Sequence, residues 1–153
     1  SHGLTQPALA LSSPIFDGSD EDGLLTMGEI LSLRLDADWV VLSACNTAAG
    51  DGAGAEAFTG LGQAFFYAGT RAVLLSNWSV ESVSAKLLTT DLFRRQAADP
   101  TLSRAGALRQ SMLALIDGPG SIDPDTGQAV FSYAHPLFWA PFSSVGDGGG
   151  STN

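Results

Sequence analysis

The chain has 153 residues, 44% hydrophobic and 15% charged, which is enough to bury one core and excludes a disordered protein. A net charge of −9, with only seven Lys and Arg residues, argues against a nucleic-acid partner. No apolar run is long enough to cross a bilayer, so no membrane partner is expected. The single cysteine excludes an intrachain disulfide and favours a reducing compartment, which predicts a cytoplasmic location.

Buried strands that alternate with helices are the main pattern along the chain. The predicted elements are a short strand at 8–11, a helix from Thr26 to about Leu33, a strand at 39–44, a helix at 56–68 with Gly69 as its C′ residue, a strand at 71–76, helices at 80–98 and 103–116, a turn-rich loop at 117–128 and a last strand ending near Val145. Thr26 and Glu29 have the spacing of a capping box. Nearly all-apolar strands between helices predict a parallel sheet covered on both faces.

Cys45 follows the apolar strand 39–44 and precedes a glycine-rich stretch. A thiol at the carboxyl end of a strand lies at the edge where the ligands of α/β proteins gather, and glycines let a substrate backbone come close. A free cysteine is equally a common core residue, so position alone leaves both interpretations open. His2, 43 residues upstream, is the candidate base for this thiol, although a terminal histidine is usually a solvated residue.

Seven blocks of the sequence together resemble one family. The block 41–47 (Val-Leu-Ser-Ala-Cys-Asn-Thr) resembles the nucleophile motif of the CHAT family, caspase-like cysteine peptidases found with tetratricopeptide repeats. The other blocks follow in that family's order: His2-Gly3, Leu24-Leu25-Thr26 with Glu29-Ile30, Gly60-Leu61 with Ala64-Phe65 and Ala68-Gly69, 76–80, Ala107-Leu108-Arg109, and His135-Pro136 with Trp139-Ala140 and Phe142. Asn77 departs from the usual leucine and Glu81 from the commoner aspartate, and the strands that precede the histidine are absent from this sequence.

The resemblance implies a catalytic dyad. His2 would deprotonate Cys45 and later protonate the leaving amine, because only the thiolate attacks efficiently. The backbone N–H groups of Cys45 and Gly3 are the expected oxyanion donors. His135 is a rival base, although most histidines that precede a proline in an aromatic stretch are structural or solvated.

Three further residues are candidates for substrate binding. Asp51 and Glu56 could line an acidic S1 pocket that pairs with a substrate arginine; the alternative makes them a turn residue and a first-turn helix charge. Trp78 is a packing anchor or a wall of the cleft. Asn46 and Thr47 are expected to bond loop backbone groups, and Trp139 to anchor packing.

The fold implied is α/β, a caspase-like three-layer α/β/α sandwich with a mostly parallel sheet whose amino-terminal strands are missing. Residues 1–147 would be the carboxyl-terminal portion of the peptidase domain and 148–153 a flexible tail. Either the protein continues upstream of Ser1, which we favour, or Ser1-His2 is an expression-vector remnant. No cofactor or metal is expected.

The function implied is that of a cysteine endopeptidase acting on a protein or peptide. The acidic candidates Asp51 and Glu56, rather than the resemblance, add the expectation of cleavage after a basic residue. Upstream or partner segments, such as tetratricopeptide repeats or a sensor, would regulate it. The alternatives are a non-catalytic caspase-like interaction module and a thiol hydrolase or acyltransferase of small molecules. Without the strands before His2 the segment alone should be weakly active or inactive, and its open sheet edge favours a homo-oligomer or swapped dimer.

Overall fold

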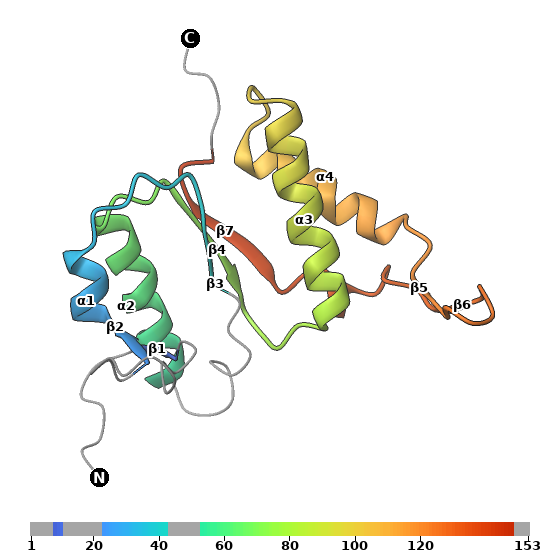
Figure 1. Ribbon diagram of the computed structural model, residues 1–153, viewed down its shortest axis with the longest axis horizontal. Helices are drawn as coiled ribbons and strands as arrows, with labels where there is room; N and C mark the ends of the chain where they lie inside the picture. Colours follow the sequence, from blue (N-terminus) through green and yellow to red (C-terminus); the bar gives the residue numbers. More distant parts are fainter. Residues whose placement is uncertain (1–7, 11–22, 43–52, 149–153) are drawn as a thin grey trace. The chain divides into compact units, whose positions relative to one another are not determined.

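The computed structural model describes residues 8–10, 23–42 and 53–148, without the side chains of Ala10 and of 53–59 (Figure 1). The elements are β1 (Ala8–Ala10), β2 (Leu24–Thr26), α1 (Met27–Ser32), β3 (Val40–Leu42), α2 (Ala53–Tyr67), β4 (Ala72–Ser76), α3 (Ser82–Ala98), α4 (Arg104–Ile116), β5 (Ser121–Ile122), β6 (Ala129–Phe131), a 3₁₀ helix (Pro136–Phe138) and β7 (Phe142–Gly146). They fall into two compact units: residues 1–40 with 47–73, and residues 41–46 with 74–153. The predicted α/β class is confirmed.

Helix α1 begins with the predicted capping box. The Glu29 backbone N–H donates to Thr26 Oγ1 at 3.3 Å, and the Thr26 backbone N–H donates to Glu29 Oε2 at 2.7 Å. These bonds satisfy amide groups that the first helical turn leaves without partners. Just before the helix, β2 pairs antiparallel with β1, with Leu25 opposite Leu9. The predicted strand at 8–11 is therefore confirmed over Ala8–Ala10, and Leu11 lies outside the described residues.

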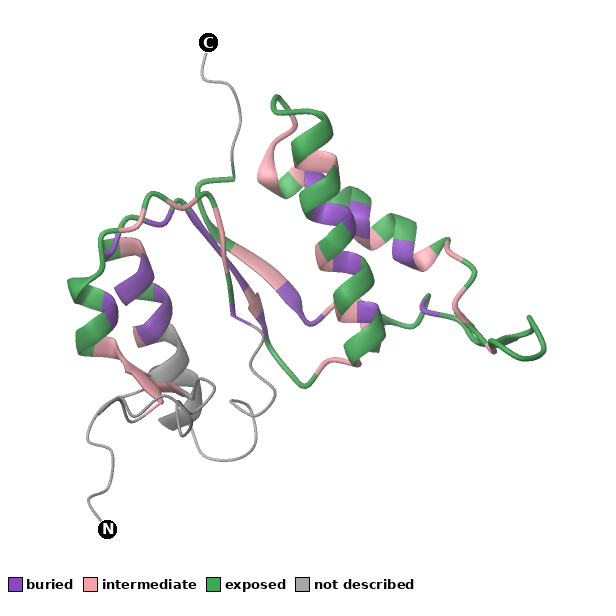
Figure 2. Ribbon diagram, in the orientation of Figure 1, coloured by how far each residue is buried: buried purple, intermediate pink, exposed green. Residues whose placement is uncertain are grey.

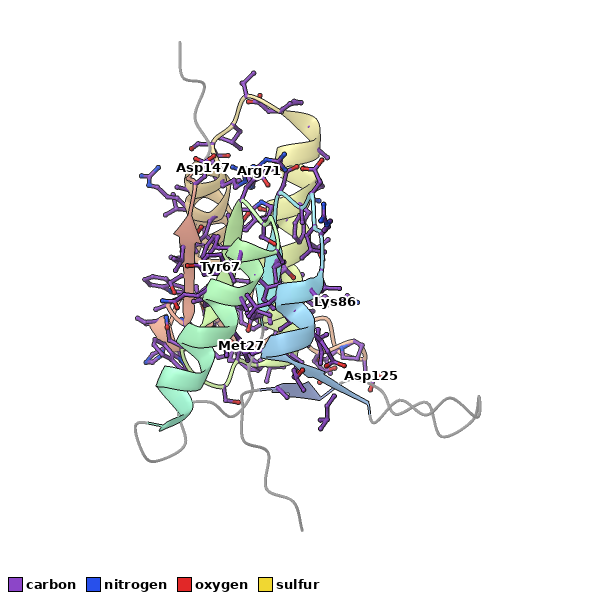
Figure 3. All side chains as sticks on the ribbon, turned by 90° about the vertical axis from the view of Figure 1, so that its left-hand side faces the viewer. Met27, Tyr67, Arg71, Lys86, Asp125 and Asp147 are labelled. Carbon is purple, nitrogen blue, oxygen red and sulfur yellow. The ribbon has the colours of Figure 1, made fainter. Side chains whose placement is uncertain are left out.

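Helices α1 and α2 pack through apolar side chains. Ile30 is fully buried on α1, and Met27 lies between the two helices, where a Cβ at Gly60 would be 3.6 Å from its sulfur (Figure 3). The buried residues of α2 recur at helical spacing: Leu61, Ala64 and Phe65, with Ala68 just beyond. The helix begins at Ala53, three residues before the predicted start at Glu56, because small residues that suggested a loop continue the helix.

The end of α2 requires a glycine. Gly69 has a φ of +106°, a backbone conformation that residues with a side chain rarely adopt. A Cβ there would lie 2.1 Å from the Leu35 carbonyl oxygen, and the Leu35 N–H donates to the Ala68 carbonyl at 2.6 Å. The predicted C′ position is therefore confirmed, and this close approach connects α2 to the segment that leads into β3.

Strands β3, β4 and β7 form a three-stranded sheet in that order. A parallel bridge between Ala37 and Thr70 precedes β3 and β4, and Arg71 pairs there with Asp36 at 2.6 Å, so these two strands run in the same direction. The carboxyl end of β4 is bonded to the amino end of β7, because the Asn77 N–H donates to the Pro141 carbonyl at 2.9 Å; β7 therefore runs the opposite way. With β1–β2 and β5–β6 also antiparallel, a mostly parallel sheet is not confirmed.

Helices α3 and α4 pack closely and carry the apolar core of their unit. Leu88 and Leu92 of α3 and Ala107 of α4 are fully buried, and Figure 2 shows buried residues on both helices along their contact. Helix α3 begins at Ser82 rather than at the predicted Val80, because Glu81 forms its N-cap. Ser103 caps α4, its hydroxyl accepting the Gly106 N–H at 3.0 Å.

A hairpin of β5 and β6 follows α4 where the sequence predicted only a turn-rich loop. The turn before β5 needs a glycine at position 120. Gly120 has a φ of +79°, and a Cβ there would lie 2.1 Å from the Phe131 carbonyl oxygen. Tyr133 is buried beside the hairpin and makes edge-to-face contacts with Phe131 and Phe138. These rings hold the hairpin against the segment that leads to β7.

Candidate functional site

The residues predicted to do the chemistry lie outside the described part of the chain. They are His2, Gly3, Cys45 and Asp51, together with Asn46 and Thr47. Glu56 lies in α2, where its side chain is not described. The structure therefore describes the elements that lead into and out of the predicted site.

Strand β3 is the element that leads to Cys45. Its last described residue, Leu42, is buried and Val40 is half-buried, but Val41 between them is 36% exposed. The expectation of a strand buried on both faces is therefore wrong for this stretch. Within the described part of the chain β3 is the first strand in the order β3-β4-β7, and the exposed position agrees with that place, because an edge strand keeps less cover than a central one.

The end of β4 is fixed to β7 by the side chain of Asn77. Its Nδ2 group donates to the Pro141 carbonyl at 2.8 Å and to Ser143 Oγ at 3.2 Å. A leucine, the residue usual in the CHAT family by the resemblance above, could make neither bond. The departure at this position therefore has a structural role, which the sequence alone did not reveal.

Trp78 follows Asn77 in the segment between β4 and α3. The residue is 38% exposed, which leaves part of its surface open to contact with a ligand. Because β3 and β4 run in the same direction, this segment leaves the sheet at the same edge as the segment after β3. The role of Trp78 as a cleft wall stays a prediction.

Glu81, the second departure from the family pattern, caps α3. Its two carboxylate oxygens accept the N–H groups of Val83 at 2.9 Å and Ser84 at 2.7 Å. Partial burial alone would raise the pKa of Glu81, but the hydrogen bonds from Ser84 and Val83 outweigh it and lower the pKa. The carboxylate stays charged at the positive end of the helix dipole, where it is stabilising.

His135, the rival base, caps the 3₁₀ helix. Its Nδ1 atom accepts the Leu137 N–H at 3.2 Å. This bond occupies one ring nitrogen in a structural role, as the interpretation of His135 as a structural residue expects. Trp139, expected to anchor packing, is half-buried, and its indole N–H donates to the Ala134 carbonyl at 3.2 Å.

Asp91 is the centre of a charged cluster that sequence reasoning missed. Its carboxylate bonds to Arg94 and accepts Arg95 Nε at 2.5 Å, both on the same helix. Burial alone would raise the pKa of Asp91, but the hydrogen bonds from Arg95 and Arg94 outweigh it and lower the pKa. The sequence could have revealed this cluster, because Arg94 and Arg95 follow Asp91 by three and four residues, spacings that bring side chains to one face of a helix.

Among the described residues, no group of three or more His, Cys, Asp or Glu side chains could hold a metal ion. None of the described helices combines the length and the apolar character needed to span a membrane.

A comparison with protein families shows to which family the chain belongs. The model of the CHAT domain matches residues 1–147, nearly the whole chain. The chain belongs to the CHAT domain family. CHAT domains are associated with caspase-like cysteine peptidases. Searches of curated proteins and of solved structures gave no match.

Proposed function

We propose that this CHAT domain is a cysteine endopeptidase in which Cys45 is the nucleophile and His2 the base. The observation that carries the proposal is the family match over residues 1–147, which include both residues in the order expected of the dyad. The parallel direction of β3 and β4 supports it, because ligands of α/β folds bind at the carboxyl edge of parallel strands. Cys45 comes three residues after the end of β3.

In the proposed reaction His2 takes the thiol proton and the Cys45 sulfur attacks the peptide carbonyl carbon. The backbone N–H groups of Cys45 and Gly3 hold the oxyanion; removal of one such donor typically costs about 3 kcal/mol of transition-state stabilisation. The C–N bond breaks as the protonated His2 gives its proton to the leaving amine. Water, deprotonated by the same histidine, then hydrolyses the acyl-enzyme and restores the thiol.

The proposed fold around this dyad is the caspase-like three-layer sandwich. It is supported by the α/β class and by helices that alternate with the strands of the three-stranded sheet β3-β4-β7. In this fold the segment with Trp78 would border the substrate cleft. The partial exposure of the residue and its position directly after β4 support that role.

The proposed specificity is for a basic residue before the scissile bond. Asp51 and Glu56 follow the nucleophile closely in a chain with a net charge of −9. A desolvated carboxylate in the S1 pocket needs a cationic partner and repels an acidic one. We further propose that upstream or partner segments regulate the domain, and that pairing of a second copy at the edge of β3 is a route to an oligomer.

The test is hydrolysis of a positional-scanning peptide library by the full-length protein. We expect cleavage after Arg or Lys, loss of cleavage in Cys45→Ala and in His2→Ala, and retention of fold in both. The variants Asp51→Asn and Glu56→Gln then test the S1 pocket, and at least one should lose the basic preference. Absence of dyad-dependent cleavage would contradict the proposal and favour a non-catalytic interaction module.

A further inference from the structure

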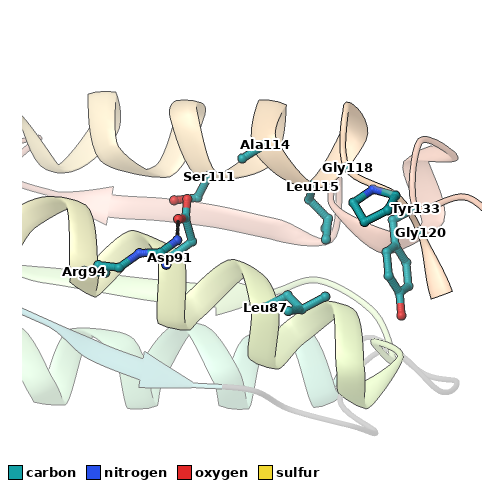
Figure 4. Close-up of a pocket in the computed structure, with 10 residues that line it drawn as sticks. Leu87, Asp91, Arg94, Ser111, Ala114, Leu115, Gly118, Gly120 and Tyr133 are labelled. Atoms are coloured by element: carbon teal, nitrogen blue, oxygen red, sulfur yellow. Dashed lines mark hydrogen bonds and ion pairs between the residues drawn. The ribbon is translucent and has the colours of Figure 1, made fainter. Parts of the chain in front are cut away.

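We infer that helices α3 and α4 form a docking site for an acidic peptide segment with an apolar anchor residue. The site is a pocket of about 310 Å³ between the two helices, the turn at 118–120 and Tyr133 (Figure 4). Pockets that bind small molecules start near this size, so the pocket has room for one large side chain. It belongs entirely to the second unit and includes no residue of the proposed dyad.

The pocket is polar at one end and apolar at the other. Arg94, Asp91 and Ser111 lie together at the polar end in Figure 4. Leu87 and Leu115 follow, and the far end is closed by the turn and the ring of Tyr133. A ligand that matches this order has an apolar group and a hydrogen-bonding, charged group a short distance apart.

The polar end favours a negatively charged group. Arg94 and Arg95 share one carboxylate, that of Asp91, so the cluster carries one positive charge in excess. The Asp91 side chain is only 12% exposed, whereas that of Arg94 is 74% exposed and has N–H groups left to donate. A ligand carboxylate can therefore bond to Arg94 from the solvent side while Asp91 remains covered.

Ser111 adds a second donor at this end. The residue is 1% exposed, and its hydroxyl lies beside the Asp91 carboxylate without a hydrogen bond of regular geometry. It is close enough to contribute to the lowered pKa of Asp91. Because a hydroxyl proton rotates freely, Ser111 can turn toward a ligand that enters the pocket.

The charge of the helix pair supports an acidic partner. Five of the seven Lys and Arg residues of the chain lie on α3 and α4, and the only acid within either helix is Asp91. Glu81, Asp99 and Asp117 flank the helix ends, with Asp117 near the turn. An acidic segment would therefore direct its carboxylates toward Arg94 and its apolar residue toward the turn.

A peptide fits better than a small molecule because the apolar surface continues past the pocket. Val83, one helical turn before Leu87 on α3, is 52% exposed and does not line the cavity. Arg94 and Tyr133, which line the pocket, are of the residue types enriched in protein interfaces, where an anchor residue fills a pocket inside a polar rim. The occupant is thus a chain segment that runs along α3.

The experiment measures fluorescence anisotropy of the labelled peptide Glu-Asp-Phe-Asp-Glu-Asp with the full chain carrying Cys45→Ala, which prevents cleavage of the probe. We expect saturable binding that weakens about tenfold when Gln and Asn replace the acids, and about tenfold when Gly replaces Phe. Because the nucleophile is absent, this result does not depend on the proposed peptidase activity.

Matched variants locate the site. Arg94→Gln should weaken binding about tenfold, whereas Lys86→Gln removes the same charge from an exposed position of α3 outside the pocket and should change it less than twofold. Ala114→Phe fills the pocket rim and should weaken binding at least fivefold, with Ala97→Phe as its exposed control. Circular dichroism checks that each variant folds.

Three results would overturn the inference. They are absence of binding at millimolar peptide, equal weakening by Arg94→Gln and Lys86→Gln, and displacement of the peptide by a single-stranded oligonucleotide or by phosphatidylserine vesicles at a lower concentration than by unlabelled peptide. Equal weakening would indicate attraction by net charge alone, and displacement would assign the helices to a nucleic acid or a membrane.

Discussion

Helices α3 and α4 and the rest of the chain carry opposite charge. The two helices hold five of the seven cationic residues and one acid, whereas the remaining segments hold two cations and fifteen acids. A net charge of −9 describes neither part. This separation of charge along the sequence agrees with the two proposals above, a basic substrate for the dyad and an acidic partner for the helix pair.

The largest expected effect separates catalysis from docking. Replacement of the proposed nucleophile in Cys45→Ala should reduce peptide hydrolysis by the full-length protein at least about 1,000-fold, because the covalent step is lost. Anisotropy of the acidic peptide should be unchanged in the same variant. Arg94→Gln should instead weaken binding of the acidic peptide about tenfold and leave peptide hydrolysis unchanged. If both variants lost both readouts, the two regions would not be separate.

The next largest effect concerns the stability of the helix pair. Leu88 is fully buried on α3, so Leu88→Ala removes core contacts and leaves a cavity. We expect a loss of about 3 kcal/mol in the free energy of unfolding, measured by urea denaturation. Leu113→Ala, at an exposed position of α4, is the control and should cost less than 1 kcal/mol. Equal losses would show that the core lies elsewhere.

Asp91→Asn should have a smaller effect, with a defined pH dependence. The variant removes the carboxylate shared by Arg94 and Arg95, and we expect a loss of about 1 kcal/mol at pH 7, because both arginines are partly exposed and solvent screens the pairs.

The sign of this dependence follows from the lowered pKa of Asp91. A carboxyl whose pKa is lower in the folded state contributes fully above its unfolded pKa, about 3.9, and loses the contribution as the pH falls through the folded value. The stability difference between wild type and variant should therefore shrink below about pH 4. A difference that grew in acid would contradict the assignment.

The smallest effect is expected for the cap of α3. Glu81→Gln keeps the length of the side chain and weakens the bonds to Val83 and Ser84, so we expect a loss of about 0.5 kcal/mol at neutral pH. Because the pKa of Glu81 is lowered in the folded state, this loss should also vanish in acid. Thermal unfolding at pH 7 and pH 3 measures both, and an acid-insensitive loss would exclude a charge-dependent cap.

Local features of the fold were predictable because neighbouring residues determine them. The capping box of Thr26 and Glu29 and the C′ glycine at Gly69 needed only short-range spacing. The hairpin after α4 was missed because two short strands among glycines and prolines have the composition of a loop. The exposure of Val41 was missed because an apolar run does not show the order of the strands, in which β3 comes first among the described ones.

Of the two proposed sites, the dyad could be predicted from the sequence and the docking pocket could not. The block around Cys45 is continuous in sequence, so its resemblance to the family could be recognised without coordinates. The pocket joins Leu87 and Arg94 of α3 to Ser111 of α4 and to Tyr133, and only packing brings these residues together. The bonds of Asn77 to Pro141 and Ser143 are another case, since 64 and 66 residues separate the partners.

Covalent labelling of the nucleophile tests the central claim most directly. The full-length protein is incubated with peptide acyloxymethyl ketones that carry Arg or Asp at P1, next to the reactive ketone, and the adduct is located by mass spectrometry. We predict alkylation of Cys45, faster with Arg than with Asp, and slowed about 100-fold by His2→Ala. Labelling that is absent from Cys45, or equally fast without His2, would contradict the dyad.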